Sequence, residues 1–252
     1  MHGKRGFDAG RGQRQIAIDR ARRFAVEWIL MLRFSLSMPE HELRETILEC
    51  GRICYERRLV TSNDGNISLR IDDRRALITA AGVCKGRMSA SDLVLIDLDG
   101  KVLQADAGMR PSSEMPMHLE VYRGRPSARA VIHAHPVCAT ALTVAGLEFP
   151  DDVLPESILA LGEVPVTPYA TPSSEADAEA IRPLIRDHEA ILLRQHGTLT
   201  VGADLEEALL RLERVEHVAE VFWRARMLGR ARRLSPAARE LLVRIREHGL
   251  RA

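Results

Sequence analysis

The stretch Ala128-Arg129-Ala130-Val131-Ile132-His133-Ala134-His135-Pro136 joins an apolar run to two closely spaced histidines. Short apolar runs of this kind are typical of a buried strand, and we predict one over 128–134. Side chains alternate across a strand, so His133 and His135 are expected on the same side. A helix is predicted next, over 137–144. Two neutral imidazole nitrogens at the end of this strand would be half of a metal site.

A third histidine follows another apolar run much later in the chain. The predicted strand 190–194 leads into Gln195-His196-Gly197, and His196 lies 61 residues after His135. If the two strands adjoin, three imidazoles converge and leave an open coordination position, as a catalytic Zn²⁺ or similar ion requires. Polar core residues, or chance, explain a His-x-His pair at least as often as a metal does. The pair alone therefore leaves both interpretations open.

The remaining pattern predicts short antiparallel strands early in the chain, followed by helices that alternate with strands. Leu43, Ile47, Cys50 and Cys54 recur at helical spacing, and we assign the two cysteines to core packing. Strands are expected at 66–71, 77–79, 93–98, 101–103 and 164–166, and helices at 114–122, from about 174, at 205–227 and from 236. No repeat or long linker interrupts this series, so we predict one α/β domain over 38–252.

Composition narrows the class of protein. The chain has 252 residues, of which 46% are apolar and 28% charged, as in a medium-sized soluble domain. Its formal net charge of +1 gives no overall attraction to nucleic acid or to an anionic membrane, and neither is expected as a partner. Four cysteines are too few for a cross-linked secreted fold of this length, which favours a cytoplasmic protein.

The first 37 residues differ from the rest. The apolar stretch 24–38 is interrupted by charges and is shorter than the roughly 20 apolar residues that a transmembrane helix needs. Arginines and glycines dominate the first 23 residues. We interpret 1–37 as a loosely ordered extension or a start site assigned too early, with an Arg-rich transit peptide as the alternative.

Three further motifs combine small, polar and acidic residues. Pro111-Ser112-Ser113-Glu114 opens the predicted helix 114–122, where free N–H groups can bind an anion. By itself the motif is more simply an N-cap. The loop 62–66 and the segment Thr79-Ala80-Ala81-Gly82 suit close approach to a ligand, yet most such loops are only turns.

The order and spacing of these motifs together resemble the class II aldolase/adducin family, in particular the sugar-phosphate aldolases typified by L-fuculose-1-phosphate aldolase. The resemblance runs from about residue 42 to 250. It is carried by six motifs in order: Asp64-Gly65-Asn66-Ile67-Ser68, Leu77-Ile78-Thr79 with Gly82, Pro111-Ser112-Ser113-Glu114, His133-Ala134-His135-Pro136, Pro168-Tyr169-Ala170-Thr171 and Gln195-His196-Gly197.

The resemblance implies a three-layer α/β/α domain around a mainly antiparallel sheet, and it implies roles for ten residues. His133, His135 and His196 would bind Zn²⁺, with Mn²⁺ or Co²⁺ as alternatives. Glu114 would lie beside the ion as acid/base, and Tyr169 would act from a neighbouring subunit as proton donor to the aldehyde, in a homotetramer with active sites between subunits. The substrate phosphate would be bound by Gly65, Asn66, Gly82, Ser112 and Ser113.

The resemblance implies retro-aldol cleavage of a ketose phosphate, such as L-fuculose 1-phosphate, to dihydroxyacetone phosphate and an aldehyde. For acid/base work Glu114 needs surroundings that bring its pKa toward neutrality. Ala81 departs from the family, because many members have Ser or Thr there, and this weakens the case for a phosphorylated substrate. A metal-dependent decarboxylase, dehydratase or 4-epimerase on the same fold is an alternative, as is a non-catalytic adducin-like interaction module. His118 is expected to be structural or to support the site.

Overall fold

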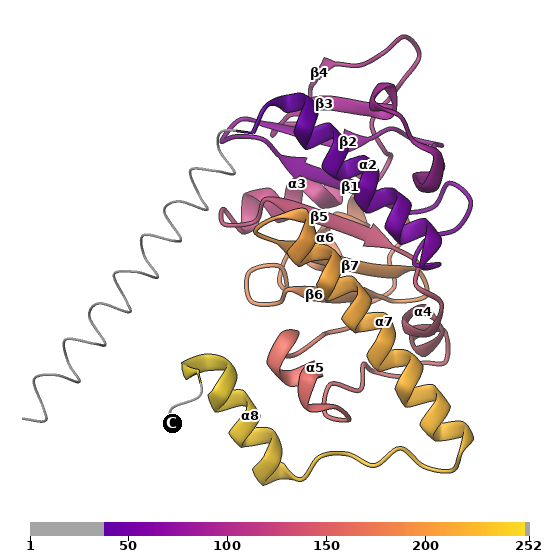
Figure 1. Ribbon diagram of the computed structural model, residues 1–252, viewed down its shortest axis with the longest axis vertical. Helices are drawn as coiled ribbons and strands as arrows, with labels where there is room; N and C mark the ends of the chain where they lie inside the picture. Colours follow the sequence, from indigo (N-terminus) through magenta and orange to yellow (C-terminus); the bar gives the residue numbers. More distant parts are fainter. Residues whose placement is uncertain (1–37, 250–252) are drawn as a thin grey trace, which may run out of the picture. The chain divides into compact units, whose positions relative to one another are not determined.

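A seven-stranded sheet forms the centre of the fold, with strand order β4-β3-β2-β1-β5-β7-β6 (Figure 1). The computed structural model describes residues 38–249, so our interpretation of 1–37 lies outside the described residues. Every neighbouring pair of strands is antiparallel, which confirms the expected sheet. The strands are β1 (Asn66–Arg70), β2 (Arg75–Thr79), β3 (Leu93–Asp97), β4 (Val102–Gln104), β5 (Ala130–Ala134), β6 (Ala190–Leu193) and β7 (Gly197–Gly202).

Helices cover both faces of the sheet, so the three-layer α/β/α architecture is confirmed. Helices α3 and α6 pack on one face, and α2, α4 and α7 on the other. The helices are α2 (Glu40–Glu56), α3 (Met115–Gly124), α4 (Val137–Val144), α5 (Pro155–Ala160), α6 (Glu175–Ile181), α7 (Leu205–Met227) and α8 (Pro236–His248).

Strand β6 shows how the sequence builds a sheet buried on both faces. Ile191 and Leu193 pack into the core beneath α3 and α6, while Ala190 and Leu192 join the core beneath α4 and α7. All four side chains are at most 2% exposed, and each fully buried Ile or Leu contributes about 1.5–3 kcal/mol to folding. The unbroken apolar run is therefore explained by two cores, one on each face.

The sequence analysis missed one strand and predicted another that the structure does not contain. The run Gly197–Gly202 is strand β7, which we did not predict; it pairs with both β5 and β6. The segment 164–166 is not a strand: it makes a single parallel bridge between Val166 and Leu192. The short helix α5 was not predicted either.

The ends of the last two helices follow their sequence signals. The Asp204 side chain accepts the N–H of Glu207 at the start of α7, and the Ser235 side chain accepts the N–H of Ala238 at the start of α8. Across residues 38–249, none of the helices combines the length and apolar character that a membrane span requires.

Candidate metal centre

The register of β5 fixes His133 on the sheet face that α3 covers. Val131, two residues earlier, packs in the core beneath α3, and alternation places His133 on the same face. Its ring is fully buried, and Nδ1 lies 2.9 Å from the carbonyl oxygen of Thr198 on β7. A carbonyl can only accept, so Nδ1 carries the proton and donates it. In the neutral ring Nε2 then carries no proton and can only accept.

His135 follows the end of β5, and a glycine allows its ring to pack. A Cβ atom on Gly197 would lie 2.7 Å from Cδ2 of His135 and 2.3 Å from the carbonyl oxygen of Ala134. Both contacts are too short, so only glycine fits at 197. Nδ1 of His135 lies 3.8 Å from a carboxylate oxygen of Asp64, which sits in the loop before β1.

His196 is carried by the hairpin between β6 and β7. Leu193 pairs with Gly197, which leaves a three-residue loop, and Gln195 in that loop has a positive φ of 56°. Three-residue hairpin loops commonly use such a left-handed residue. The strand that contains His133 and the strand that precedes His196 do not adjoin, as convergence of the histidines was expected to require, because β7 lies between β5 and β6. The hairpin brings His196 to the site through the strand that we missed.

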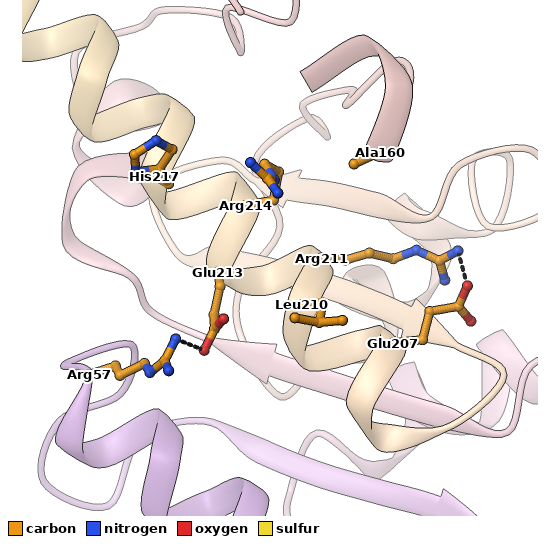
Figure 2. A pocket seen from close by; sticks show the side chains of 8 residues that line it. All are labelled: Arg57, Ala160, Glu207, Leu210, Arg211, Glu213, Arg214 and His217. Carbon is orange, nitrogen blue, oxygen red and sulfur yellow. Dashed lines mark hydrogen bonds and ion pairs between the residues drawn. The ribbon is translucent and has the colours of Figure 1, made fainter. Parts of the chain in front are cut away.

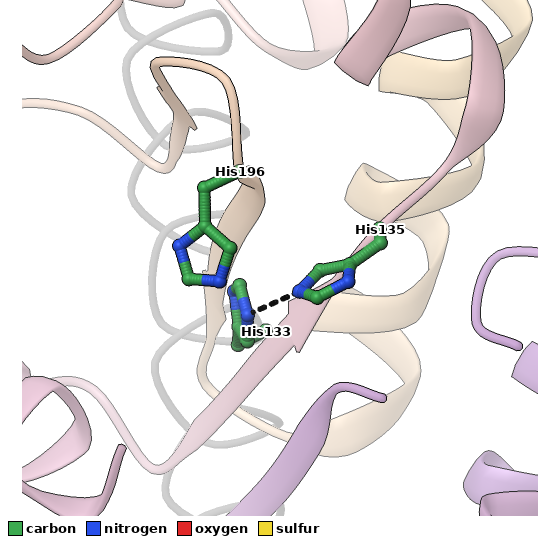
Figure 3. A group of neighbouring side chains, drawn as sticks. All are labelled: His133, His135 and His196. Atoms are coloured by element: carbon green, nitrogen blue, oxygen red, sulfur yellow. Dashed lines mark hydrogen bonds between the residues drawn. The ribbon is translucent and has the colours of Figure 1, made fainter. Parts of the chain in front are cut away.

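The three imidazole rings converge at the end of these strands (Figure 3). Their centroids are 4.7, 4.7 and 4.9 Å apart, and Nε2 of His133 lies 2.8 Å from Nε2 of His135. Burial lowers the pKa of His133 to about 3. Burial and the nearby His196 ring also lower the pKa of His135. At neutral pH both rings are therefore uncharged, the form that binds a metal.

Glu114 precedes α3 and points its carboxylate at the histidines. One oxygen lies 3.3 Å from Nε2 of His133 and the other lies 3.2 Å from Nε2 of His196. Burial alone would raise the pKa of Glu114. Hydrogen bonds with His196 and from Asn66 outweigh burial and hold the pKa well below its usual range. The condition that we set for acid/base work, a pKa brought toward neutrality, is not met in these surroundings, and the carboxylate is ionised.

These donors fit a divalent cation. The unprotonated Nε2 of His133 faces a carboxylate oxygen of Glu114, so two electron pairs oppose each other across 3.3 Å. A cation between such groups turns this repulsion into attraction. Three imidazole nitrogens with one adjacent carboxylate suit Zn²⁺, and also Mn²⁺ or Co²⁺. One ligating nitrogen from each of the three histidines lies within 4.8 Å of the other two, which is close enough for a single ion to bind all three.

Asp177 on α6 is a further carboxylate at the site that sequence reasoning missed. One ligating atom each of Glu114, Asp177 and His196 lie within 4.8 Å of one another. Within the part of the chain that the structure describes, Oδ2 of Asp177 and Nδ1 of His196 are both buried without a hydrogen-bond partner. Burial raises the pKa of Asp177, although His196 lowers it in part. No motif surrounds Asp177, so only the packing of α6 reveals it.

The loops predicted to hold a phosphate lie beside one another at this end of the sheet. The N–H of Ser112 donates to the carbonyl of Thr79, and the N–H of Ala81 donates to the carbonyl of Arg110. Gly82 has a positive φ of 77°, and a Cβ placed there would meet nothing within 4 Å. Open space above a glycine backbone allows a ligand to approach closely.

Lys85 ties two of these loops together, and sequence reasoning did not identify it. Its ammonium donates to the carbonyl oxygens of Asn63 and Val83, at 2.9 and 2.7 Å. Gly65, in the Asn63 loop, is also constrained, because a Cβ there would lie 2.8 Å from the carbonyl oxygen of His133. Burial lowers the pKa of Lys85 to about 8, so the group is still mostly charged at neutral pH. The sequence signal is a lysine three residues after Gly82.

The other predicted phosphate ligands have mixed surroundings. Ser112 is buried, and its hydroxyl accepts the N–H of Glu114 at 3.3 Å. The exposed Ser113 hydroxyl lies 2.8 Å from that of Ser173. Asn66 is 3% exposed, and its side chain is used by Glu114 and His118. Ser112 and Ser113 thus remain candidates, while the Asn66 side chain supports Glu114.

Among residues 38–249, no hydrogen bond or ion pair joins the Tyr169 side chain to the three histidines or to Glu114. The Tyr169 side chain is 60% exposed. The predicted role for Tyr169 requires a second subunit, so it stays a prediction.

A separate cleft lies along α7 (Figure 2). Arg57 pairs with Glu213 there, and Arg211 pairs with Glu207. No predicted site residue lines this cleft, so it is distinct from the metal centre. Its lining comprises Arg57, Ala160, Glu207, Leu210, Arg211, Glu213, Arg214 and His217.

Comparison with known proteins agrees with this geometry. Residues 45–223 match the family model of the Class II Aldolase and Adducin N-terminal domain. The 3-oxo-tetronate 4-phosphate decarboxylase of Haemophilus influenzae is 33% identical over 190 residues, which are 74% of this chain and 89% of that protein. The L-fuculose phosphate aldolase of Methanococcus maripaludis is 32% identical over 180 residues, 71% of this chain and 95% of that protein.

The fold is likewise shared with solved structures. The crystal structure of YgbL from Klebsiella pneumoniae superposes with a TM-score of 0.76 at 30% identity, over 82% of this chain and all of that one. Sequence match, fold and the resemblance of the six motifs therefore agree, and the protein belongs to the class II aldolase/adducin family.

Proposed function

We propose that the protein is a divalent-metal-dependent carbon–carbon lyase that decarboxylates a 3-oxo-tetronate 4-phosphate. The observation that carries the proposal is the set of three converging histidines with the ionised Glu114 beside them. A relative supports the choice of substrate: the 3-oxo-tetronate 4-phosphate decarboxylase of Haemophilus influenzae is 33% identical to this chain over most of that protein's length. We also propose a cytoplasmic location and a homotetramer.

The chemistry explains why one site serves decarboxylases and aldolases alike. In a 3-oxo-tetronate 4-phosphate the ketone at C3 lies β to the carboxylate. When the C1–C2 bond breaks, CO₂ leaves and its electron pair stays as the enediolate of dihydroxyacetone phosphate. Aldol cleavage of a ketose 1-phosphate leaves the same enediolate after its C3–C4 bond breaks. The two reactions differ in the leaving group.

The residues of this chain divide the work. His133, His135 and His196 would hold the ion, which when bound supplies a Lewis acid to the carbonyl oxygen of the substrate. Glu114, which is ionised before the reaction, would take up a proton from solvent and pass it to C2 of the enediolate, which completes dihydroxyacetone phosphate. Its two carboxylate oxygens already face the Nε2 atoms of two histidines, so it is held where that proton is needed.

The phosphate would bind where the three loops meet. Backbone N–H groups near Gly65 and Gly82, with the hydroxyls of Ser112 and Ser113, would contact it, and the charge of Lys85 lies behind them. Ala81 removes one hydroxyl that many family members have. A lost hydrogen bond to a charged group costs about 1.5–3 kcal/mol, and Lys85 would offset part of this.

Aldol cleavage of a ketose 1-phosphate, such as L-fuculose 1-phosphate, is the second candidate. It is favoured by the exposure of Tyr169, since a residue that serves a neighbouring subunit must project from its own. Loss of an aldehyde requires proton exchange at its oxygen, and Tyr169 would supply this. Loss of CO₂ requires no such partner, which is why we place decarboxylation first.

The test is a direct comparison of products. The purified protein, loaded with Zn²⁺, Mn²⁺ or Co²⁺ in turn, is incubated with a 3-oxo-tetronate 4-phosphate and separately with L-fuculose 1-phosphate. We expect equal amounts of CO₂ and dihydroxyacetone phosphate from the first, above the spontaneous rate measured with His135→Ala. An aldehyde and dihydroxyacetone phosphate from the second, with no CO₂ from the first, would establish the second candidate instead.

A further inference from the structure

A line of buried polar side chains connects Glu114 to the middle of α3. Asn66 and Ser68 are two residues apart on β1 and so share one face, while His118 and Tyr122 are four apart on α3 and share another. These two faces meet. None of the four residues is more than 3% exposed. The function proposed above does not use His118, Ser68 or Tyr122.

Successive members of the line are within hydrogen-bond distance. Nδ2 of Asn66 lies 2.7 Å from a carboxylate oxygen of Glu114, and Oδ1 of Asn66 lies 2.5 Å from Nε2 of His118. Nδ1 of His118 lies 2.7 Å from the Ser68 hydroxyl. That hydroxyl lies 2.6 Å from the Tyr122 hydroxyl, which is also 3.3 Å from the carbonyl of Arg129.

The two ends of the Asn66 amide fix the direction of these bonds. Nδ2 of Asn66 can only donate, here to the Glu114 carboxyl group, and Oδ1 can only accept, here from His118. His118 must then donate from Nε2, which in a neutral ring leaves Nδ1 to accept from Ser68. Ser68 in turn accepts from Tyr122, whose single hydroxyl proton is then directed to Ser68 at 2.6 Å rather than to the carbonyl of Arg129 at 3.3 Å. All donors therefore point toward Glu114, and aligned chains of this kind strengthen each bond.

The line ends inside the protein, which excludes a path for protons to solvent. Its last member is the buried Tyr122, whose other neighbour is the backbone carbonyl of Arg129. What the line can do is hold an orientation. A flipped Asn66 amide would set its carbonyl oxygen against the Glu114 carboxylate, and the Nε2 donor of His118 disfavours that flip. Burial lowers the pKa of His118 to about 4, which keeps the ring neutral.

We propose that His118 is a positioning residue: protonated on Nε2, it fixes the Asn66 amide, which holds the Glu114 carboxylate toward the metal centre. This inference deepens the proposed function, because it rests on Glu114 as the acid/base. It makes a statement about one ring proton that can be observed without any substrate.

The first test is the protonation state of His118. Nitrogen NMR of the full-length protein, with and without Zn²⁺, assigns the His118 signals by their loss in His118→Gln. We expect a neutral ring that carries its proton on Nε2 at pH 7 in both samples. A proton on Nδ1, or a charged ring, would overturn the proposal whatever substrate the enzyme takes.

The second test separates positioning from packing. In His118→Gln the side-chain amide can donate to Asn66 and accept from Ser68, whereas His118→Leu keeps the bulk and does neither. We expect a loss in kcat of roughly 10- to 100-fold in His118→Leu, comparable to losses of supporting residues elsewhere. KM and bound metal should be unchanged, and His118→Gln should recover most of the activity. Equal kcat in the two variants would overturn the proposal.

Ser68→Ala and Tyr122→Phe keep the proposal testable if His118→Leu does not fold. Each removes one hydroxyl farther along the line, so kcat should fall less in Ser68→Ala than in His118→Leu, and least in Tyr122→Phe. Losses in the reverse order would contradict transmission toward Glu114. If wild-type protein turns over neither proposed substrate, the proposed function fails, while the NMR test still decides the state of His118.

Discussion

The fully buried His118 and the three histidines of the metal centre differ in how completely the protein provides hydrogen-bond partners for their ring nitrogens. Both ring nitrogens of His118 have hydrogen-bond partners, in Asn66 and Ser68. At the metal centre, Nε2 of His133 lies 2.8 Å from Nε2 of His135 and 3.3 Å from a carboxylate oxygen of Glu114, which are all acceptors in the unprotonated form, and Nδ1 of His196 lacks a partner among residues 38–249.

The difference indicates which histidines find all their hydrogen-bond partners within the chain and which require a further component. Buried polar groups are costly unless they are paired, so a protein retains an unpaired set where something else completes it. For His133, His135 and His196 the missing component has the character of a cation. For His118 nothing is missing, which fits a supporting role.

The largest expected effect comes from removing one member of the incomplete group. His135→Ala should bind no stoichiometric metal and lose all measurable turnover, because two histidines and a carboxylate leave too few ligands for a tight site. Metal analysis after gel filtration, together with the lyase assay, measures both. Normal turnover by metal-free His135→Ala would rule out the metal centre as the site of chemistry.

Glu114→Gln should separate metal binding from proton transfer. The amide keeps the size of the side chain but cannot carry a proton, so kcat is expected to fall roughly 10²- to 10⁴-fold. Metal content should match wild type, since the three histidines remain. Retention of full activity would show that another group carries the proton.

Asp177→Asn should have a smaller effect, on metal affinity. Asp177 and His196 offer ligating atoms within 4.8 Å of each other, and supporting carboxylates typically alter metal affinity about 10- to 100-fold. Competition with a fluorescent chelator gives the Kd. Asp177→Glu, which keeps the charge, serves as the matched control; affinities that are identical in all three proteins would exclude Asp177 from the centre.

Burial of neutral His118 predicts that the free energy of unfolding depends on pH. The pKa of His118 is about 4 in the folded protein, against about 6.5 unfolded, so the unfolded chain binds more protons between those values. The stability that neutral His118 contributes is full above pH 6.5 and is lost as the pH falls toward 4, by about 3 kcal/mol. Urea titrations of metal-free wild type and His118→Gln at pH 7 and 5 should show a shallower decline in the variant. Parallel declines would mean that His118 is not buried as described.

The metal-binding histidines could be predicted from the sequence more completely than the residues that surround them. His133 and His135 could be predicted as neighbours because strand alternation is local, and the six motifs pointed to Glu114 and His196. The strand β7 escaped prediction because Gly197-Thr198-Leu199-Thr200 lacks a simple apolar pattern. It nevertheless lies between β5 and β6 and supplies the carbonyl that orients His133.

Residues that act through packing between distant elements could not be predicted from local patterns. Asp177 reaches the site only because α6 packs on the face that α3 covers. The spacing of Glu114, His118 and Tyr122 is visible along α3, yet its meaning depends on Asn66 and Ser68 facing it from β1. Loop contacts through Lys85 likewise join segments whose pairing no sequence motif states.

The most direct test of the central claim is an anomalous diffraction map of crystals grown from Zn²⁺-loaded protein. We predict one zinc peak per chain, about 2.0–2.1 Å from Nε2 of each of His133, His135 and His196. A map with no peak among these rings, or with the zinc bound elsewhere in the chain, would contradict the claim that the three histidines form a metal centre.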